Sequence, residues 1–317
     1  MDIRLSRLCV NILVFVGICV SPVRAEYYNS LTGKAHHYIG LSLGGGESNN
    51  VGKSSREGYA LTHMAGAGAN ISLQYEVQYH SWIFGIGVAG QYHYLRDSLA
   101  NFVESDARVD RNGESVDYGY VYSNYRERDH VAGVAADVYV GKNIGKWVYA
   151  LVGAKFSLPL WSRYTTDTRM LTQGDYGWNI EPVRSVGGND FSSLGYYPED
   201  SYSHTEQYEE YMRIAATVEV GSNIPIRHAK SRLRAGVYAT YGFRLGQSPS
   251  NPLVDYSRIN KDAATQSLAD MQQNIRWHAL NTSSVTSSAL PQHLEVGVRL
   301  TWLFDVTIEK KTCNCVK

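Results

Sequence analysis

Residues 130–160 carry a two-residue alternation of apolar and polar positions, which predicts two long strands joined by a tight turn at 143–146. One face is apolar and nearly unbroken: Ala132, Val134, Ala136, Val138, Val140, Val148, Ala150, Val152, Ala154, Phe156 and Leu158. The other face mixes glycine and small residues with the widely spaced charges Asp137 and Lys155. An apolar face longer than a usual soluble strand is typical of a strand with one side in lipid and the other facing a lumen.

The same two-faced pattern recurs along the chain and predicts eight strands in all. Besides the two at 130–160, they are His37–Gly45, Met64–Val77, 82–94, Tyr211–Ile224, 232–245 and His293–Val306. No run beyond the amino-terminal segment reaches the roughly 18 apolar residues of a membrane helix.

The connections between these strands alternate between short and long. The long ones are Glu47–Leu61, Asp97–Asp129, Ser162–Glu210 and Gln247–Gln292. Short turns at one end and long loops at the other are typical of outer-membrane barrels, and open edges cannot remain in lipid. We therefore expect an all-β, closed, antiparallel, eight-stranded transmembrane β-barrel over residues 36–306, with short periplasmic turns and long extracellular loops. A soluble lipocalin-like barrel, the alternative, would place its charged phase outside and distribute its loops evenly.

Residues 35–306 resemble the small eight-stranded outer-membrane barrels, the class that contains the membrane domain of outer-membrane protein A and the OmpX-like proteins. The motif Glu295-x-Gly297-x-x-Leu300-x-Trp302, followed by Phe304, is similar to the last-strand signal by which such barrels are presented to their insertion machinery. The chain departs from many members because residues 307–317 follow the motif. The resemblance implies a non-enzymatic structural or surface-interaction protein in the outer membrane of a diderm bacterium.

The amino terminus has the parts of a secretory signal: Arg4 and Arg7, an apolar core over Leu8–Val20, and Val23-Arg24-Ala25. We expect cleavage after Ala25 on Sec-type export, with 26–35 as a short periplasmic segment. An anchor helix, or a lipoprotein that uses Cys19, is the alternative. The mature chain then keeps only Cys313 and Cys315, in the periplasmic tail 307–317, where a tether, a dimer contact and a remnant all stay open.

Charged side chains on the inward faces form a candidate network in the lumen. They are Glu76, Asp137, Lys155, Arg213, Glu219, Arg232, Arg234, Arg244, Glu295 and Arg299. An eight-stranded barrel is just wide enough for its side chains, and unpaired buried ions are costly, so we expect a salt-bridged plug. A narrow gated pore is the alternative function. Overall, 30 basic residues balance 30 acidic ones, which gives no indication of nucleic-acid binding.

Aromatic residues lie where the strands should meet the membrane interfaces. Trp82, Trp147, Trp302 and Phe304 fall at the short-turn end, and Tyr92, Tyr94 and Trp161 at the long-loop end. Such amphipathic rings favour the headgroup level, so membrane lipids are the first expected partners.

A lipid-modifying enzyme is the third functional hypothesis. His93 and His293 should point inward near the long loops, with Asp97, Ser98 and Glu295 not far away in sequence. No nucleophile elbow, phosphate loop or zinc helix motif is present, and His36-His37 fits the solvated start of a strand better than a metal site. We therefore assign no catalytic, cofactor or metal residues.

The long loops are rich in tyrosine with small polar neighbours, as at 117–122, which is typical of adaptable recognition surfaces. An extracellular ligand or host surface is thus a possible partner, whereas the oligomeric state stays open. Within the last loop, Leu268, Met271, Ile275 and Ala279 have helical spacing, so residues 262–279 predict a short amphipathic helix on the barrel rim.

Overall fold

The computed structural model describes residues 35–52, 54, 58–109, 115–175, 197–226, 231–245, 251–257, 275–286 and 292–307. The predicted signal peptide and the tail with Cys313 and Cys315 lie outside these residues. Among the described residues no helix has the length and apolarity needed to cross a membrane.

Eight antiparallel strands form a closed ring, as the alternation predicts. In ring order they are β1 (His36–Val51), β2 (Leu61–Tyr79), β3 (Trp82–Leu99), β5 (Ser115–Ile144), β6 (Val148–Asp175), β8 (Arg213–Pro225), β9 (Ser231–Arg244) and β12 (Gln292–Asp305). The ring closes where β1 pairs with β12, from Tyr38↔Asp305 to Val51↔Gln292. The sequence expectation of a closed eight-stranded barrel is confirmed.

The outer wall of the ring is apolar. On β3 the exposed apolar residues run from Trp82 to Tyr92, on β6 from Val148 to Trp161, and on β12 from Val298 to Phe304. Leu41, Ile86 and Val138 are 47%, 60% and 55% exposed, although such side chains are normally buried in a soluble protein. This band defines the membrane-spanning part of the barrel.

The described parts of the two central long connections, 97–109, 115–129, 162–175 and 197–210, are mostly in strands, so the strands predicted from sequence end too early there. β3 and β5 continue beyond the apolar band, and β4 (Phe102–Val109) pairs with β5. β6 likewise continues to Asp175, where β7 (Tyr197–Gln207) pairs with it. The two-residue period persists in these extensions, but tyrosine now points inward and arginine outward, which the lipid-facing pattern does not anticipate.

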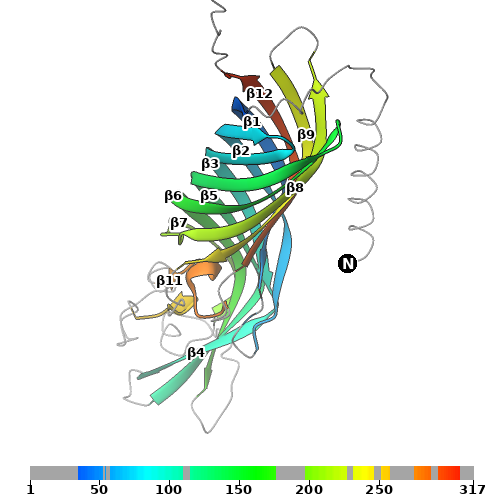
Figure 1. Ribbon diagram of the computed structural model, residues 1–317. Helices are drawn as coiled ribbons and strands as arrows, with labels where there is room; N and C mark the ends of the chain where they lie inside the picture. Colours follow the sequence, from blue (N-terminus) through cyan, green and yellow to red (C-terminus); the bar gives the residue numbers. More distant parts are fainter. Residues whose placement is uncertain are drawn as a thin grey trace, which may run out of the picture.

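The extracellular extensions enclose a hydrophobic core of their own. Figure 1 shows them projecting from the barrel at the end opposite to the start of β1 and the end of β12. The core contains Tyr59, Leu99, Phe102, Tyr120, Tyr122, Tyr125, Tyr164, Met170, Leu253, Val254, Ile275, Trp277, Ala279, Leu280 and Val285. We call this part of the molecule the extracellular head.

The described parts of the last long connection, residues 251–257 and 275–286, enter the head as irregular and extended chain. Here β10 (Val254–Asp255) pairs with β11 (Arg276–Trp277), and the 3-10 helix η3 (Leu280–Thr282) follows. The prediction of a helix over 262–279 is therefore wrong at its carboxyl end, where Ile275 and Ala279 lie on either side of the strand β11. Residues 262–274 of that prediction lie outside the described residues.

Candidate functional site

The lower lumen contains a buried ion pair. Arg234 on β9 donates from Nη1 to Glu76 Oε2 at 2.6 Å and from Nη2 to Glu76 Oε1 at 2.9 Å. Its Nε donates to Asn223 Oδ1 at 3.0 Å, and its guanidinium lies 4.8 Å from the centre of the Tyr149 ring. The side chains of Arg234 and Glu76 are 1% and 0% exposed. The guanidinium therefore finds its counter-charge and its hydrogen-bond acceptors within the protein and not in solvent.

A second ion pair lies beside the first. Arg299 donates from Nη1 to Glu219 Oε2 at 2.9 Å, and Tyr149 donates its hydroxyl proton to Glu219 Oε1 at 2.6 Å. The Arg299 guanidinium also lies 4.7 Å from the centre of the Tyr238 ring, and Tyr238 donates to Glu295. Tyrosine hydroxyls therefore complete the bonding of lumen carboxylates that the arginines leave unsatisfied.

The other predicted network residues have different partners. Arg232 donates to Gln78 Oε1 at 3.0 Å and to the Tyr38 hydroxyl, whereas Arg213 pairs with Glu210 at the outer rim, 3.4 Å away. Arg244 donates to the Asn281 carbonyl. Asp137 and Lys155 are register partners on β5 and β6. The structure thus joins four of the network residues in two acid–base pairs, which the sequence did not specify, and three arginines bond to other oxygens.

The upper lumen contains a serine between two histidines. Ser48 Oγ lies 2.7 Å from His293 Nε2 and 3.1 Å from His93 Nδ1, and the two rings meet edge to face at 4.8 Å. His93 Nδ1 is 3.9 Å from Glu295 Oε2. Sequence analysis placed both histidines inward but assigned Ser48 to a loop, because the predicted strand ends at Gly45. Ser98, the serine it named, bonds weakly to the Thr62 carbonyl instead.

Two small cavities remain between the lumen side chains. One has a volume of 30 Å³ and is lined by Glu219, Arg234 and Arg299; the other, beside His93 and His293, has a volume of 20 Å³. Each has room for about one or two waters. Ser48 is completely buried, so no lipid-sized substrate has access to it.

A segment of the last connection bonds to side chains at the outer end of the lumen. Leu280 donates its backbone N–H to Glu127 Oε1 at 2.8 Å, and Asn281 Nδ2 donates to Asp129 Oδ2 at 3.1 Å. Asn50 on β1 donates from Nδ2 to Asn281 Oδ1 at 3.3 Å and to Asp97 Oδ2 on β3 at 2.8 Å. We call residues 279–283 the mouth segment.

The mouth carboxylates Asp97, Glu127 and Asp129 are buried together. Sequence analysis named Asp97 only as a neighbour of the two histidines, and it did not name Glu127 or Asp129, because both lay in a predicted loop. Burial raises the pKa of Glu127 to about 8. Burial also raises the pKa of Asp129, and the nearby Glu127 and Asp97 carboxylates raise it further. Burial and mutual repulsion therefore favour the protonated form in this pair of carboxylates.

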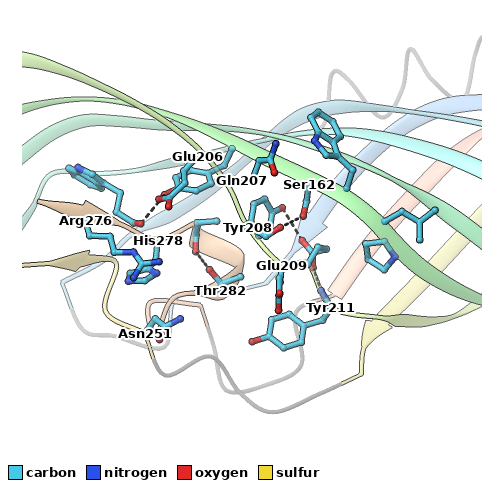
Figure 2. A pocket seen from close by; sticks show the side chains of 17 residues that line it. Ser162, Glu206, Gln207, Tyr208, Glu209, Tyr211, Asn251, Arg276, His278 and Thr282 are labelled. Atoms are coloured by element: carbon cyan, nitrogen blue, oxygen red, sulfur yellow. Dashed lines mark hydrogen bonds between the residues drawn. The ribbon is translucent and has the colours of Figure 1, made fainter. Parts of the chain in front are cut away.

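A larger pocket of 860 Å³ lies at the rim of the barrel (Figure 2). Its walls are β6 residues 159–162 and 164, the segment 206–211, Asn251, and residues 276–279 and 282. Figure 2 shows Arg276 and His278 on one side of the pocket, and Tyr208, Glu209 and Tyr211 on the other. Burial and the nearby Arg276 lower the pKa of His278. We call this cavity the rim pocket; no sequence motif pointed to it.

The predicted interface aromatics lie on the outer surface. Trp82, Tyr92, Trp147, Trp161, Trp302 and Phe304 are 39–48% exposed. Tyr94 is half-buried, with its ring 5.0 Å from that of His130. In the last-strand motif, Leu300 and Trp302 point outward, and Glu295 points into the lumen. No cluster of three or more His, Cys, Asp or Glu residues within the described chain has the arrangement of a metal site.

Comparisons with known proteins give little beyond this architecture. No protein-family model matches the chain, and no curated protein does. Among solved structures, Neisserial surface protein A (NspA) is similar with 10% identity, a TM-score of 0.26, and coverage of 84% of this chain and 97% of that chain. Ail of Yersinia pestis, in complex with the heparin analogue sucrose octasulfate, is similar with 12% identity, a TM-score of 0.23, and coverage of 85% and 97%.

These TM-scores are too low to carry an argument, so the assignment depends on the ring itself. A closed circle of eight antiparallel strands with an apolar outer wall is the architecture of the small outer-membrane β-barrels, and this chain has it.

Proposed function

We propose that the protein acts at the cell surface by binding a ligand or another surface through its extracellular head, while its lumen stays closed. The observation that carries the proposal is the core of the head, in which Phe102, Tyr122 and Trp277 are almost completely buried. Extracellular connections that only join strands need no such core. A packed head holds its surface in one shape, which lowers the entropy lost on binding.

The contents of the lumen support a plug rather than a pore. The pairs Glu76–Arg234 and Glu219–Arg299 lie in the lumen, and the mouth segment lies across its outer end. Opening a path would separate buried charges from their partners, which costs several kcal/mol, about 3–5 for one pair. The narrow gated pore is therefore the weaker hypothesis.

Planar bilayer recordings test the closed lumen. We expect no sustained conductance steps from the purified wild-type protein. Sustained steps that disappear when the mouth segment is crosslinked would contradict the plug and establish the gated pore.

Cell binding tests the head. A variant without most of the head, which we call the trimmed barrel, has residues 100–124 and 168–203 replaced by short turns. In this variant β3, β5, β6 and β8 keep their membrane segments. We expect bacteria that display the full protein to adhere to extracellular surfaces, and those that display the trimmed barrel to lose adhesion. The trimmed protein must still shift its gel mobility on boiling. Equal adhesion by the two proteins would refute a binding role for the head.

We propose no enzymatic activity, because Ser48, His93 and His293 are enclosed by the lumen wall. Mass spectra of the membrane lipids, recorded with and without the protein, test this. A lipid product that depends on the protein and is lost in Ser48→Ala would establish the enzyme instead.

Residence in the outer membrane requires export and insertion. We propose that residues 1–25 direct export and that the Glu295–Trp302 motif directs insertion. Retention of the precursor after deletion of 8–20, and loss of assembled barrel after Trp302→Ala, are the expected results.

A further inference from the structure

The wall of the barrel is interrupted at the rim pocket. β6 pairs with β8 as far as Ser157↔Arg213 and with β7 from Arg163↔Gln207 onward. Between these two ladders, no register pair joins 158–162 to 208–212, and the backbone bond from Tyr208 N–H to the Ser162 carbonyl, 3.2 Å long, lies at the upper edge. On the other side of β6 the register shifts beside Pro159, which has no N–H to donate. The pocket therefore occupies a side window in the wall.

This window lies at the outer edge of the apolar band. Leu160 and Met212 on its lower side are 67% and 46% exposed on the lipid-facing surface, and Trp161 is 41% exposed. Its upper side is formed by polar residues of the head, including Gln207, Asn251 and Arg276. An amphiphile in the outer leaflet would thus reach the window with its headgroup at the polar side and its chain along Leu160.

The pocket lining favours a positively charged group. Three carboxylates line it, those of Glu206, Glu209 and Glu210, against the single guanidinium of Arg276. Glu210 is engaged by Arg213 and the Tyr208 hydroxyl, and Glu206 accepts from Tyr164 and contacts His204. Glu209 is exposed, and within the described chain its carboxylate has no hydrogen bond or ion pair.

Aromatic rings stand beside these carboxylates. Trp161 and Tyr208 line the same pocket, whereas the third aromatic residue of the lining, Tyr211, already has the Arg244 guanidinium 3.2 Å from its ring centre. Aromatic faces attract ammonium groups through the ring quadrupole, and the attraction is larger where water is partly excluded. Carboxylates and rings therefore select the same ligand charge, whereas a phosphate or sulfate headgroup would be repelled.

We propose that the rim pocket binds the amine or ammonium headgroup of a membrane amphiphile, which enters sideways through the window between β6 and β8. This goes beyond the proposed surface role, because the ligand comes from the membrane and not from outside the cell. The apolar chain lies along Leu160 and Met212, and the headgroup lies between Trp161 and Glu209.

A series of amphiphiles with the same chain and different headgroups tests the charge preference. The full barrel in nanodiscs is incubated with radiolabelled dodecyltrimethylammonium, and dodecyl maltoside and dodecyl phosphate compete for the site. We expect the unlabelled ammonium amphiphile to compete at the lowest concentration and the phosphate at the highest. Equal competition by all three, or the tightest binding by the sugar headgroup, would overturn the proposal. Equal competition by chain-free tetramethylammonium would refute entry from the lipid.

Two matched pairs of variants locate the site. Glu209→Lys should weaken binding of dodecyltrimethylammonium about tenfold, whereas Glu47→Lys, the same charge change on β1 across the ring, should leave it unchanged. Trp161→Ala should weaken binding roughly three- to tenfold, and Trp147→Ala, an interface tryptophan at the other end of the barrel, should not. All four proteins must retain the gel shift of a folded barrel. Binding that is the same in Glu209→Lys and wild type would place the ligand elsewhere and refute the assignment.

Discussion

Arg234 and Glu76 form a doubly hydrogen-bonded ion pair across the lumen, on strands that are not neighbours in the ring. β9 carries Arg234 and β2 carries Glu76, and β12 and β1 lie between them. The pair therefore joins two parts of the wall that no backbone ladder connects. Because both groups are fully buried, each depends on the other for its charge balance.

The first expected outcome concerns this pair. Glu76→Ala leaves the Arg234 guanidinium buried without its carboxylate, and we expect the free energy of unfolding to fall by about 3–5 kcal/mol. Urea titration of the refolded barrel, with boiled and unboiled gel mobility as the readout, measures the change.

A double variant separates charge from packing. Glu76→Leu combined with Arg234→Met removes both charges and keeps apolar volume, so we expect it to recover most of the lost stability. Glu47→Ala, an exposed carboxylate on β1, should change stability by less than about 0.5 kcal/mol. If Glu76→Ala unfolds at the wild-type urea concentration, the pair contributes nothing and the proposed plug loses its main support.

The membrane part of the fold could be predicted because lipid imposes a simple rule on every strand. Ile86 and Val138 both point outward because each faces lipid. An apolar residue at every second position is therefore enough to identify both strands. The pairs inside the lumen follow no such rule. Arg232 and Arg234 both point inward from β9, yet one reaches Gln78 and the other Glu76, and the period of two does not distinguish them.

The extracellular head could not be predicted because the chemistry of the two faces changes above the membrane. A bulge between Ser123 and Arg126 also shifts the phase, so that Tyr122 and Tyr125 both point inward. Ser48 was missed for another reason. The glycine run before it was taken as the end of the strand, whereas Gly46 lies inside the ladder, opposite Gly297.

The second expected outcome is a pH dependence that originates at Glu127. Its pKa rises from 4.5 to about 8 on folding, so the folded protein holds a proton that the unfolded chain has released. Between these pH values the unfolded state binds fewer protons, and stability therefore decreases as pH rises. Below pH 4.5 the effect is absent, and above pH 8 it is complete.

Glu127→Gln tests this effect because it keeps the shape and fixes the neutral form. Between pH 5 and pH 8.5, we expect the free energy of unfolding to fall by about 2–4 kcal/mol more in the wild type than in the variant. The midpoints of thermal gel-shift curves measure this difference. The groups around Glu127 are Tyr125, Asp129, Asp97 with its bonded His63, and Leu280 of the mouth segment. These groups remain in both proteins, but the Glu127 carboxylate also raises the pKa of Asp129, so the difference between the two profiles reports on the Glu127–Asp129 pair. Parallel pH profiles for the two proteins would mean that Glu127 is ionised in the folded state.

The third expected outcome concerns Asn281, which holds the mouth segment through its side chain. Asn281 bonds to Asp129 at 3.1 Å and to Asn50 at 3.3 Å. Asn281→Ala removes both bonds, and we expect local opening of the mouth segment to become easier by about 1–3 kcal/mol.

Limited proteolysis followed by mass spectrometry detects that opening. New cleavage within 275–286 should appear in Asn281→Ala while the ring keeps its gel shift. Ser284→Ala, one residue beyond the mouth segment, serves as the control, because it removes a side chain and leaves both Asn281 bonds in place. Cleavage in both variants, or in neither, would show that Asn281 does not hold the segment.

The fourth expected outcome concerns the seam where the ring closes. Gly46 on β1 and Gly297 on β12 are register partners, and a Cβ built on Gly297 would overlap the Gly45 carbonyl. Gly297→Ala must therefore move the two strands apart, and we expect the free energy of unfolding to fall by about 1–3 kcal/mol, with a lower yield of heat-modifiable barrel.

Gly90→Ala on β3 is the matched control, because its Cβ would meet only Ile71 Cγ2 at 3.7 Å, an ordinary contact. It should fold as well as wild type. If Gly297→Ala also refolds at wild-type yield and stability, the close approach at the seam is not required for closure, and the glycine of the last-strand motif would act in insertion alone.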